Sequence, residues 1–207
     1  MMVRSNVMKE KVALRLIIFL CWIIPLTASA YESELPPAMQ SSMPPPNLKA
    51  VSWVLMNPDT GIMIAAENPD EKMEPASLSK LLTAYIIFRE IRRGNLSPEE
   101  EVVISENAWR TGGSRMFIEP GERISVENLL LGMIVQSGND AAVALAEHVA
   151  GSEESFSGLL NQVAAELGLR NSHFVNSTGW PHPDHFSSAR DISLITSAII
   201  REFPDMY

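Results

Sequence analysis

Cysteine is almost absent from this sequence, which contains one, Cys21, in 207 residues. A single cysteine excludes a disulfide framework and any zinc site built on several cysteines. Basic residues are also scarce, because 16 Lys+Arg stand against 25 Asp+Glu and give a formal charge of −9. Nucleic-acid-binding domains usually carry a basic face, so this balance argues against a nucleic-acid partner.

Long apolar runs are absent as well. The longest one, from Leu16 to Ile24, has nine residues, whereas a membrane-spanning helix needs about 20. Basic residues precede this run, and the small-residue sequence Ala28-Ser29-Ala30 follows it, which is the pattern of a secretory signal peptide. We therefore predict a cleaved signal over residues 1–30 and an exported protein. The alternative is an uncleaved N-terminal anchor.

Cleavage after Ala30 would change the composition of the chain. It would remove Cys21, four basic residues and one acidic residue, and so leave 12 basic and 24 acidic residues with a net charge of −12. The mature protein would not depend on disulfides. Its acidic character would also disfavour direct adhesion to anionic lipid.

The mature chain has two parts. Residues 31–48 are rich in proline and predict an extended lead-in, and residues 49–207 predict one folded domain. A turn sequence at residues 57–61 between two β-type runs predicts a β-hairpin over residues 50–66. Helical spacing and capping residues predict helices over 77–93, 125–136, 140–150, 155–167 and 189–202, with a short strand at 102–105. The fold class expected is α+β, an antiparallel sheet begun by the hairpin together with a helical cluster.

Ser77 and Lys80 form the first candidate for chemistry. Positions i and i+3 share a helix face, and a serine at a helix start lies near the positive end of the helix dipole. Backbone N–H groups there bind a developing negative charge, and a buried lysine with a lowered pKa acts as a general base. By composition, however, about 0.5 Ser-x-x-Lys motifs are expected by chance, and on spacing alone an N-cap serine followed by a solvated lysine is the favoured interpretation.

Ser137-Gly138-Asn139 is the second candidate. It interrupts two apolar helical stretches, so its side chains are expected to face a buried cleft, although a capped helix break is the simpler interpretation. Ser105-Glu106-Asn107 has the same form and is interpreted as an ordinary turn.

Taken together, these motifs resemble the active-site-serine acyl-transfer family of penicillin-binding proteins, most closely the low-molecular-mass, serine-type D-alanyl-D-alanine carboxypeptidases. The resemblance covers about residues 48–207 and rests on five segments, which are Pro75–Tyr85, Gly113–Phe117, Leu131–Ala141, Phe174–Pro181 and Phe186–Asp191. It implies a serine β-lactamase-like fold of the α+β class.

The resemblance also implies a function. Ser77 would attack the carbonyl between the last two D-alanines of a peptidoglycan stem peptide, and Lys80 would accept its proton. Ser137 would relay a proton to the leaving amine, and Asn139 would bind the substrate's peptide backbone. β-Lactams would acylate the same serine. The family implies no metal or cofactor, a location in the periplasm or on the outer face of the bacterial inner membrane, and membrane attachment only through a C-terminal segment that is not in this sequence.

One family motif is missing. The family carries Lys-Thr-Gly on a strand after the second motif, but this sequence has no lysine after Lys80. Arg110-Thr111-Gly112 has a similar form, but it precedes Ser137 and falls in the region of the family's connecting segment, which Gly113–Phe117 resembles. Because the hairpin also leaves the sheet short of strands, we expect the chain to be an N-terminal portion whose catalytic domain is partial.

Three rival functions remain open. A class A-like β-lactamase would need a glutamate where Ser157-Gly158-Leu159-Leu160-Asn161 has a serine, and an aspartate in place of Gly138. An inactive remnant would only bind cell-wall peptide or a partner protein. A cross-bridge endopeptidase would use the same site on a different peptide.

Other conspicuous residues have simpler interpretations. His182 and His185 lie in a Pro-rich stretch that is interpreted as a surface loop rather than a metal site. Asp140 and Asp191 are expected to be structural, as a cap or a loop partner. The three tryptophans of the mature chain are expected to pack rather than to stack on a ligand, namely Trp53, Trp109 and Trp180.

Overall fold

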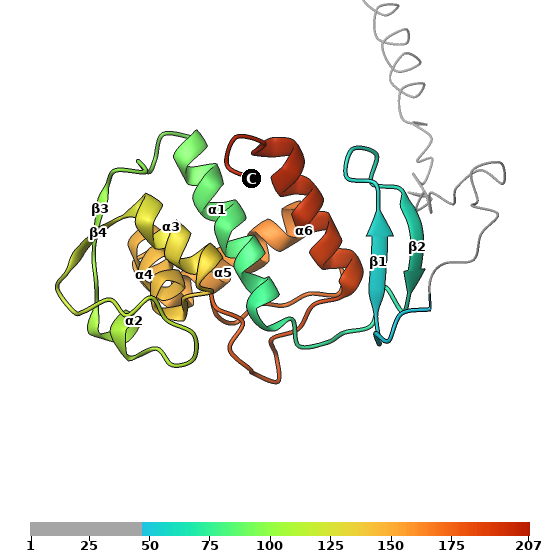
Figure 1. The fold of residues 1–207 in the computed structure, drawn as a ribbon, viewed down its shortest axis with the longest axis horizontal. Coiled ribbons are helices and arrows are strands. Elements are labelled where there is room, and N and C mark those ends of the chain that lie inside the picture. Colours follow the sequence, from blue (N-terminus) through green and yellow to red (C-terminus); the bar gives the residue numbers. More distant parts are fainter. Residues whose placement is uncertain (1–46) are drawn as a thin grey trace, which may run out of the picture. The chain divides into compact units, whose positions relative to one another are not determined.

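The computed structural model of the protein describes residues 47–207 (Figure 1). The predicted signal over 1–30 and nearly all of the lead-in over 31–48 lie outside the described residues. The predicted hairpin is confirmed, since β1 (Trp53–Met56) pairs antiparallel with β2 (Met63–Glu67). Its turn is organised by Asn57, whose side-chain oxygen accepts from the backbone N–H groups of Asp59 and Thr60 at 2.9 and 3.0 Å.

The segment that carries Ser77 differs from the prediction. The sequence predicted one α-helix over 77–93, whereas the chain first forms a 3₁₀ turn, Ala76–Ser79, and then α1 (Lys80–Arg92). In the turn, the Leu78 N–H donates to the Pro75 carbonyl at 3.1 Å. A 3₁₀ turn repeats every three residues, so Ser77 and Lys80 lie almost above one another.

A second small sheet was only partly predicted. It pairs β3 (Glu101–Val103) with β4 (Arg123–Ser125), and the short helix α2 (Glu106–Arg110) lies between them in the chain. The Ser105 hydroxyl accepts from the Ala108 N–H at 2.9 Å, so Ser105-Glu106-Asn107 is a helix N-terminus and not the turn that was expected.

The remaining helices agree with the predicted positions. They are α3 (Val126–Val135), α4 (Asn139–Ala150), α5 (Glu153–Glu166) and α6 (Ala189–Glu202). Helix α5 begins two residues earlier than predicted, because Ser152 caps it through the Ser155 N–H. The break between α3 and α4 falls where the sequence placed it, and Ser137 there has a positive φ of 54°.

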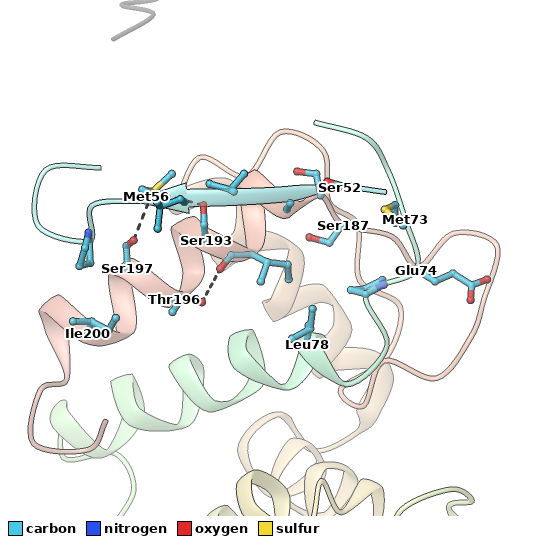
Figure 2. Close-up of a pocket in the computed structure, with 17 residues that line it drawn as sticks. Ser52, Met56, Met73, Glu74, Leu78, Ser187, Ser193, Thr196, Ser197 and Ile200 are labelled. Carbon is cyan, nitrogen blue, oxygen red and sulfur yellow. Dashed lines mark hydrogen bonds between the residues drawn. The ribbon is translucent and has the colours of Figure 1, made fainter. Parts of the chain in front are cut away.

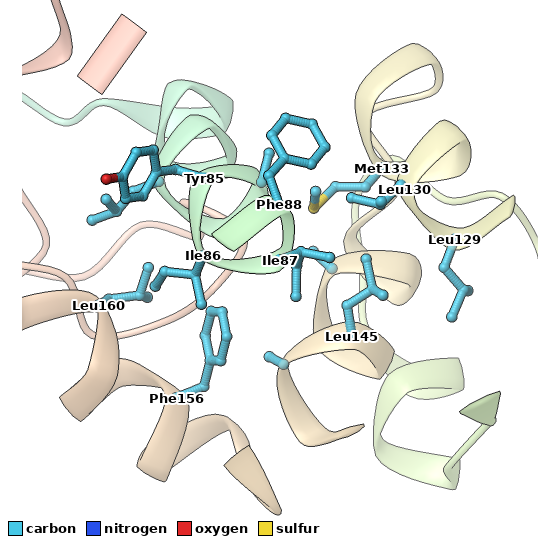
Figure 3. Packing of buried hydrophobic residues seen from close by; sticks show 14 of the residues in the cluster. Tyr85, Ile86, Ile87, Phe88, Leu129, Leu130, Met133, Leu145, Phe156 and Leu160 are labelled. Carbon is cyan, nitrogen blue, oxygen red and sulfur yellow. The ribbon is translucent and has the colours of Figure 1, made fainter. Parts of the chain in front are cut away.

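The core forms around α1 (Figure 3). From α1, Ile86 and Ile87 pack among side chains of α3, α4 and α5, including Met133, Leu145 and Phe156. Helix α4 adds four buried alanines, whose small side chains let neighbouring helices approach closely.

Helix α6 connects the hairpin to the helical cluster. It contacts both α1 and β1, and Phe203 just after it meets the Tyr85 ring edge-on at 5.3 Å between centroids. The predicted α+β class is confirmed. None of the helices described over residues 47–207 combines the length and the apolar character that crossing a bilayer requires.

Candidate active site

Two hydroxyls and one amine meet at the start of α1. The Lys80 amine lies 3.2 Å from the Ser77 hydroxyl oxygen and 3.3 Å from the Ser137 hydroxyl oxygen. The two hydroxyl oxygens are 3.0 Å apart, with Ser137 donating to Ser77. The structure therefore brings together residues that are 57 to 60 positions apart in the sequence.

Lys80 has two further acceptors. Its amine donates to the side-chain oxygen of Asn139 at 2.7 Å and to the Thr178 carbonyl at 3.0 Å. These two oxygens only accept, whereas the serine hydroxyls both donate and accept. A neutral amine has two N–H donors and one lone pair. With its donors on Asn139 and Thr178, its lone pair is left to face the hydroxyls.

Burial favours the neutral form of this amine. Lys80 is only 6% exposed, and loss of hydration lowers its pKa to about 8. At pH 7 about a tenth of the lysine is then neutral, far more than at the ordinary pKa of lysine. Ser77 itself is exposed, so its hydroxyl is open to solvent while the amine beside it is buried.

Two of the four non-glycine residues with a positive φ in the described part of the chain lie at this site. Ala76, directly before Ser77, has a φ of 48°, and Ser137 has a φ of 54°, both in the left-handed region that residues with a Cβ rarely adopt. Such strain costs about 1–3 kcal/mol per residue and persists only where the surroundings enforce it.

Asn139 is held on both sides of its amide. Its nitrogen donates to the Gly112 carbonyl at 2.7 Å while its oxygen accepts from Lys80. Its backbone N–H donates to the Ser114 carbonyl at 2.7 Å. The sequence did not indicate this hydrogen bond between Asn139 and the Lys80 amine.

Asp140 fastens the connecting segment beside the site. Its carboxylate accepts from the backbone N–H groups of Met116 and Phe117 at 3.0 and 2.9 Å. The prediction that Asp140 is a loop partner is confirmed. Asp191 has a similar place, accepting from the Asn171 N–H and the Ser172 hydroxyl, both at 2.7 Å.

The surface-loop interpretation is wrong for one of the two histidines. His185 is 2% exposed, and its Nε2 lies 2.8 Å from the Ser79 hydroxyl oxygen. Burial, together with the nearby His173 and His182, lowers the pKa of His185 to about 4. The His182 side chain is half exposed. Within residues 47–207 no group of three or more His, Cys, Asp or Glu side chains is arranged to hold a metal ion.

Trp180 packs against the connecting segment but stays 52% exposed, so the packing interpretation holds only for part of its ring. A Cβ at Gly113 would lie 2.9 Å from the Trp180 ring and 2.7 Å from the Asn139 amide nitrogen. Glycine is therefore needed where the connecting segment approaches the site. Of the other tryptophans, Trp53 donates from its ring nitrogen to Glu67 and Trp109 is 37% exposed.

A pocket of about 590 Å³ lies between β1 and α6 and is not lined by Ser77 or Ser137 (Figure 2). Its walls are mostly apolar, and Met56, Ile200 and Leu78 are among them. It borders the 3₁₀ turn at Leu78, but none of Ser77, Lys80, Ser137 and Asn139 lines it.

The geometry of these residues defines a class of site. A serine hydroxyl beside a buried, partly neutral amine is the arrangement of an active-site-serine acyl-transfer enzyme. A family model for D-alanyl-D-alanine carboxypeptidases matches residues 39–207, and the chain belongs to this family.

Curated relatives agree with this assignment. The chain is 40% identical to the D-alanyl-D-alanine carboxypeptidase DacC of Escherichia coli over 176 residues, 82% of this chain and 44% of that protein. It is 37% identical to DacA of Haemophilus influenzae over 194 residues, 92% of this chain and 49% of that protein. The chain thus spans about half the length of the curated relatives it matches.

Solved structures show the same fold. The D-alanyl-D-alanine carboxypeptidase DacD of Francisella tularensis superposes with a TM-score of 0.76 at 43% identity, over 78% of this chain and 39% of that one. Penicillin-binding protein 5 of Haemophilus influenzae gives 0.76 at 38% identity, over 79% and 48% of the two chains. The predicted serine β-lactamase-like fold of penicillin-binding proteins is confirmed.

Proposed function

We propose that this chain carries the nucleophile and the base of a serine-type D-alanyl-D-alanine carboxypeptidase. The substrate would be a peptidoglycan stem pentapeptide, and the product would lack its terminal D-alanine. The observation that carries the proposal is the position of the Lys80 amine, 3.2 Å from Ser77 and 3.3 Å from Ser137. The relatives described above are named for the same reaction, which supports the proposal.

The proposed acylation begins with a proton transfer. Lys80 takes the proton of the Ser77 hydroxyl as the oxygen attacks the carbonyl between the two D-alanines. A C–O bond forms and the carbonyl oxygen becomes an oxyanion, which backbone N–H groups at the start of the helix would stabilise. The C–N bond then breaks, and Ser137 passes the proton from Lys80 to the leaving nitrogen, so D-alanine departs with a neutral amine.

The proposed deacylation reverses these roles with water as the nucleophile. Lys80 removes a proton from water, the water oxygen attacks the ester, and Ser77 recovers its proton. Asn139 contributes by fixing the amine and, with its remaining N–H, by contacting the substrate backbone. No metal or cofactor takes part in this scheme. A β-lactam would enter at the first step and leave an ester on Ser77.

The site favours a carboxypeptidase over a class A-like β-lactamase. Those enzymes use a glutamate for deacylation, and the corresponding segment here has Ser157, whose hydroxyl donates to the Phe174 carbonyl at 2.7 Å. Asn161 donates to the same carbonyl at 2.6 Å. Both side chains are therefore engaged in holding the loop after α5 and do not point a base at Ser77.

The proposed location follows from the proposed substrate. Stem peptides of peptidoglycan lie outside the cytoplasm, and the N-terminal pattern over residues 1–30 is that of an export signal. We place the mature domain, residues 49–207, in the periplasm or on the outer face of the bacterial inner membrane.

Labelling with fluorescent penicillin tests the proposal. The protein is expressed from its own gene, incubated with the label and separated under denaturing conditions. We expect a covalent band that Ser77→Ala removes and that Ser97→Ala, a change at an exposed loop serine, leaves intact. Release of D-alanine from a pentapeptide should follow the same pattern.

Three outcomes would contradict the proposal. Absence of labelling in the folded native protein would favour a role restricted to binding. Sustained, rapid nitrocefin hydrolysis would favour a β-lactamase. Cleavage of cross-linked dimers without release of D-alanine from pentapeptide would favour an endopeptidase.

A further inference from the structure

His185 links two segments that both reach the base. Its Nε2 lies 2.8 Å from the hydroxyl oxygen of Ser79, and its Nδ1 lies 3.2 Å from the backbone nitrogen of Val175. A backbone N–H only donates, so Nδ1 must be the acceptor and Nε2 must carry the hydrogen that Ser79 accepts. The ring is thus a neutral imidazole of one tautomer, with both nitrogens engaged.

Each partner of His185 is close to Lys80 along the chain. Ser79 belongs to the 3₁₀ turn that carries Ser77, and it immediately precedes Lys80. Val175 lies three residues before Thr178, whose carbonyl accepts from the Lys80 amine at 3.0 Å. The bond to Ser79 therefore fixes the backbone that carries the Lys80 side chain. The bond to Val175 fixes the loop whose Thr178 carbonyl accepts from the Lys80 amine.

The surroundings of His185 allow little movement. The ring meets Phe174 edge-on at 5.5 Å between centroids, and Ser79 is 1% exposed. The same two segments meet again where Thr83 donates to the Ser177 carbonyl at 2.8 Å. Buried hydrogen bonds of this kind are costly to leave unmade, so the histidine and its partners hold a single arrangement.

We propose that His185 is a positioning residue of the acyl-transfer site, holding the Ser79 turn and the Val175 loop together so that the Lys80 amine keeps its acceptor at Thr178 and faces Ser77. This inference rests on the proposed function. It assigns His185 no contact with substrate. Its effect is expected in the rate of acylation and not in the binding of the acylating agent, because the residue acts through the geometry of the base.

The test compares His185→Phe with His185→Gln in the protein expressed from its own gene. Phenylalanine keeps a ring but removes both hydrogen bonds, whereas glutamine can accept from Val175 and donate to Ser79. The kinetics of penicillin labelling are measured against penicillin concentration, which separates the binding constant from the first-order acylation rate. His148→Phe is the matched control, because His148 bonds Glu100 at the surface, away from Ser77.

We expect His185→Phe to lower the acylation rate about 10- to 100-fold with the binding constant changed less than threefold, since small misplacements of reacting groups cost rates of this order. His185→Gln should restore the rate to within about threefold of the native protein, and His148→Phe should leave it unchanged. If His185→Phe does not fold, Ser79→Ala removes the same bond from the other side and should lower the rate in the same direction.

Two results would overturn the assignment. One is a folded His185→Phe protein that acylates at the native rate, and the other is a loss that appears in the binding constant instead. If the native protein itself is not labelled, the proposed function fails first, so the two failures are distinguishable.

Discussion

Lys80 shows how one residue's surroundings set its chemistry. The side chain is buried at the start of α1, and loss of hydration lowers its pKa to about 8. No carboxylate is among the four hydrogen-bond partners recorded for its amine, which are Ser77, Ser137, Asn139 and the Thr178 carbonyl. The amine is therefore held by neutral groups, which leave it able to lose its proton near neutral pH.

Replacing Asn139 by aspartate should change the pH dependence of acylation. A general base must be unprotonated, so the acylation rate should rise with pH up to the pKa of Lys80 and level off above it. In Asn139→Asp an anionic oxygen would lie where the 2.7 Å acceptor now lies, and an adjacent opposite charge raises a lysine pKa by about 1–3 units. The midpoint should move upward from about 8 by at least one unit.

The measurement is the rate of penicillin labelling between pH 6 and 10, with Ser97→Ala as the control. The position of the midpoint is the test, because the variant also loses the bond from Asn139 to the Gly112 carbonyl and its maximal rate will fall for that reason. An unchanged midpoint would mean that Lys80 is not the base.

The sequence predicted the side chains of the site better than their surroundings. We predicted Ser77, Lys80, Ser137 and Asn139 because their short motifs stand within longer segments that resemble a known family, since the spacings alone are weak evidence. Thr178 was not predicted, because it contributes a backbone carbonyl that every residue has. His185 was misplaced because a Pro-rich stretch has no periodicity from which burial can be inferred.

At the scale of elements, the 3₁₀ turn and the loop that ends at Trp180 determine the position of Ser77. Gly179, with a φ of +83°, lies so close to the turn that a Cβ there would clash with the Ala76 carbonyl oxygen and lie 2.9 Å from the Ser79 hydroxyl oxygen. The Asn176 side chain holds this loop by accepting from the backbone N–H groups of residues 178, 179 and 180. The contact with this loop therefore holds the 3₁₀ turn in its strained conformation.

Gly179→Ala should therefore be strongly destabilising. The substitution adds the strain of a left-handed alanine, about 1–2 kcal/mol, to a backbone clash, so we expect a loss of about 3 kcal/mol or more in the free energy of unfolding. Gly168→Ala is the control, since Gly168 also has a positive φ of +75°, but a Cβ added there would meet no other atom within 4 Å. Urea denaturation gives the free energy of unfolding of both variants, and the difference between their losses measures the clash apart from the backbone strain. Equal losses would show that the loop moves away without cost.

Short elements were the ones that the sequence did not predict. The hairpin and the long helices follow from turn residues and hydrophobic spacing that extend over ten or more positions. Helix α2 and strand β4 have five and three residues, so no period is established within them. The 3₁₀ turn was missed because Ser77 and Lys80 are spaced three apart in either kind of helix.

For the molecule as a whole, Phe203 joins the last helix to the first. It is 2% exposed and its ring lies 5.3 Å from that of Tyr85 and 5.7 Å from that of Phe88. Tyr85 also donates to the Glu202 carboxylate at 2.8 Å. Since α6 also packs on β1, this contact ties the hairpin to the helical cluster.

Phe203→Ala should lower the free energy of unfolding by about 3–5 kcal/mol, because it removes a buried aromatic side chain and leaves a cavity. Phe117→Ala is the matched control, because Phe117 is 76% exposed and its removal should cost less than about 1 kcal/mol. Thermal and urea denaturation followed by circular dichroism provide both values. Comparable losses in the two variants would show that α6 is not held through Phe203.

The placement of Lys80 on α1 has a consequence for how the protein loses activity. This helix buries eight of its residues, the catalytic candidate Lys80 among them, and Leu82, Ile86 and Ile87 from the same helix are completely enclosed. Unfolding of the whole helix would expose these side chains together with the amine, which makes it nearly as costly as opening the whole domain. We therefore expect that, when the protein is denatured, the Lys80 amine loses its acceptors in the same transition in which this helix unfolds.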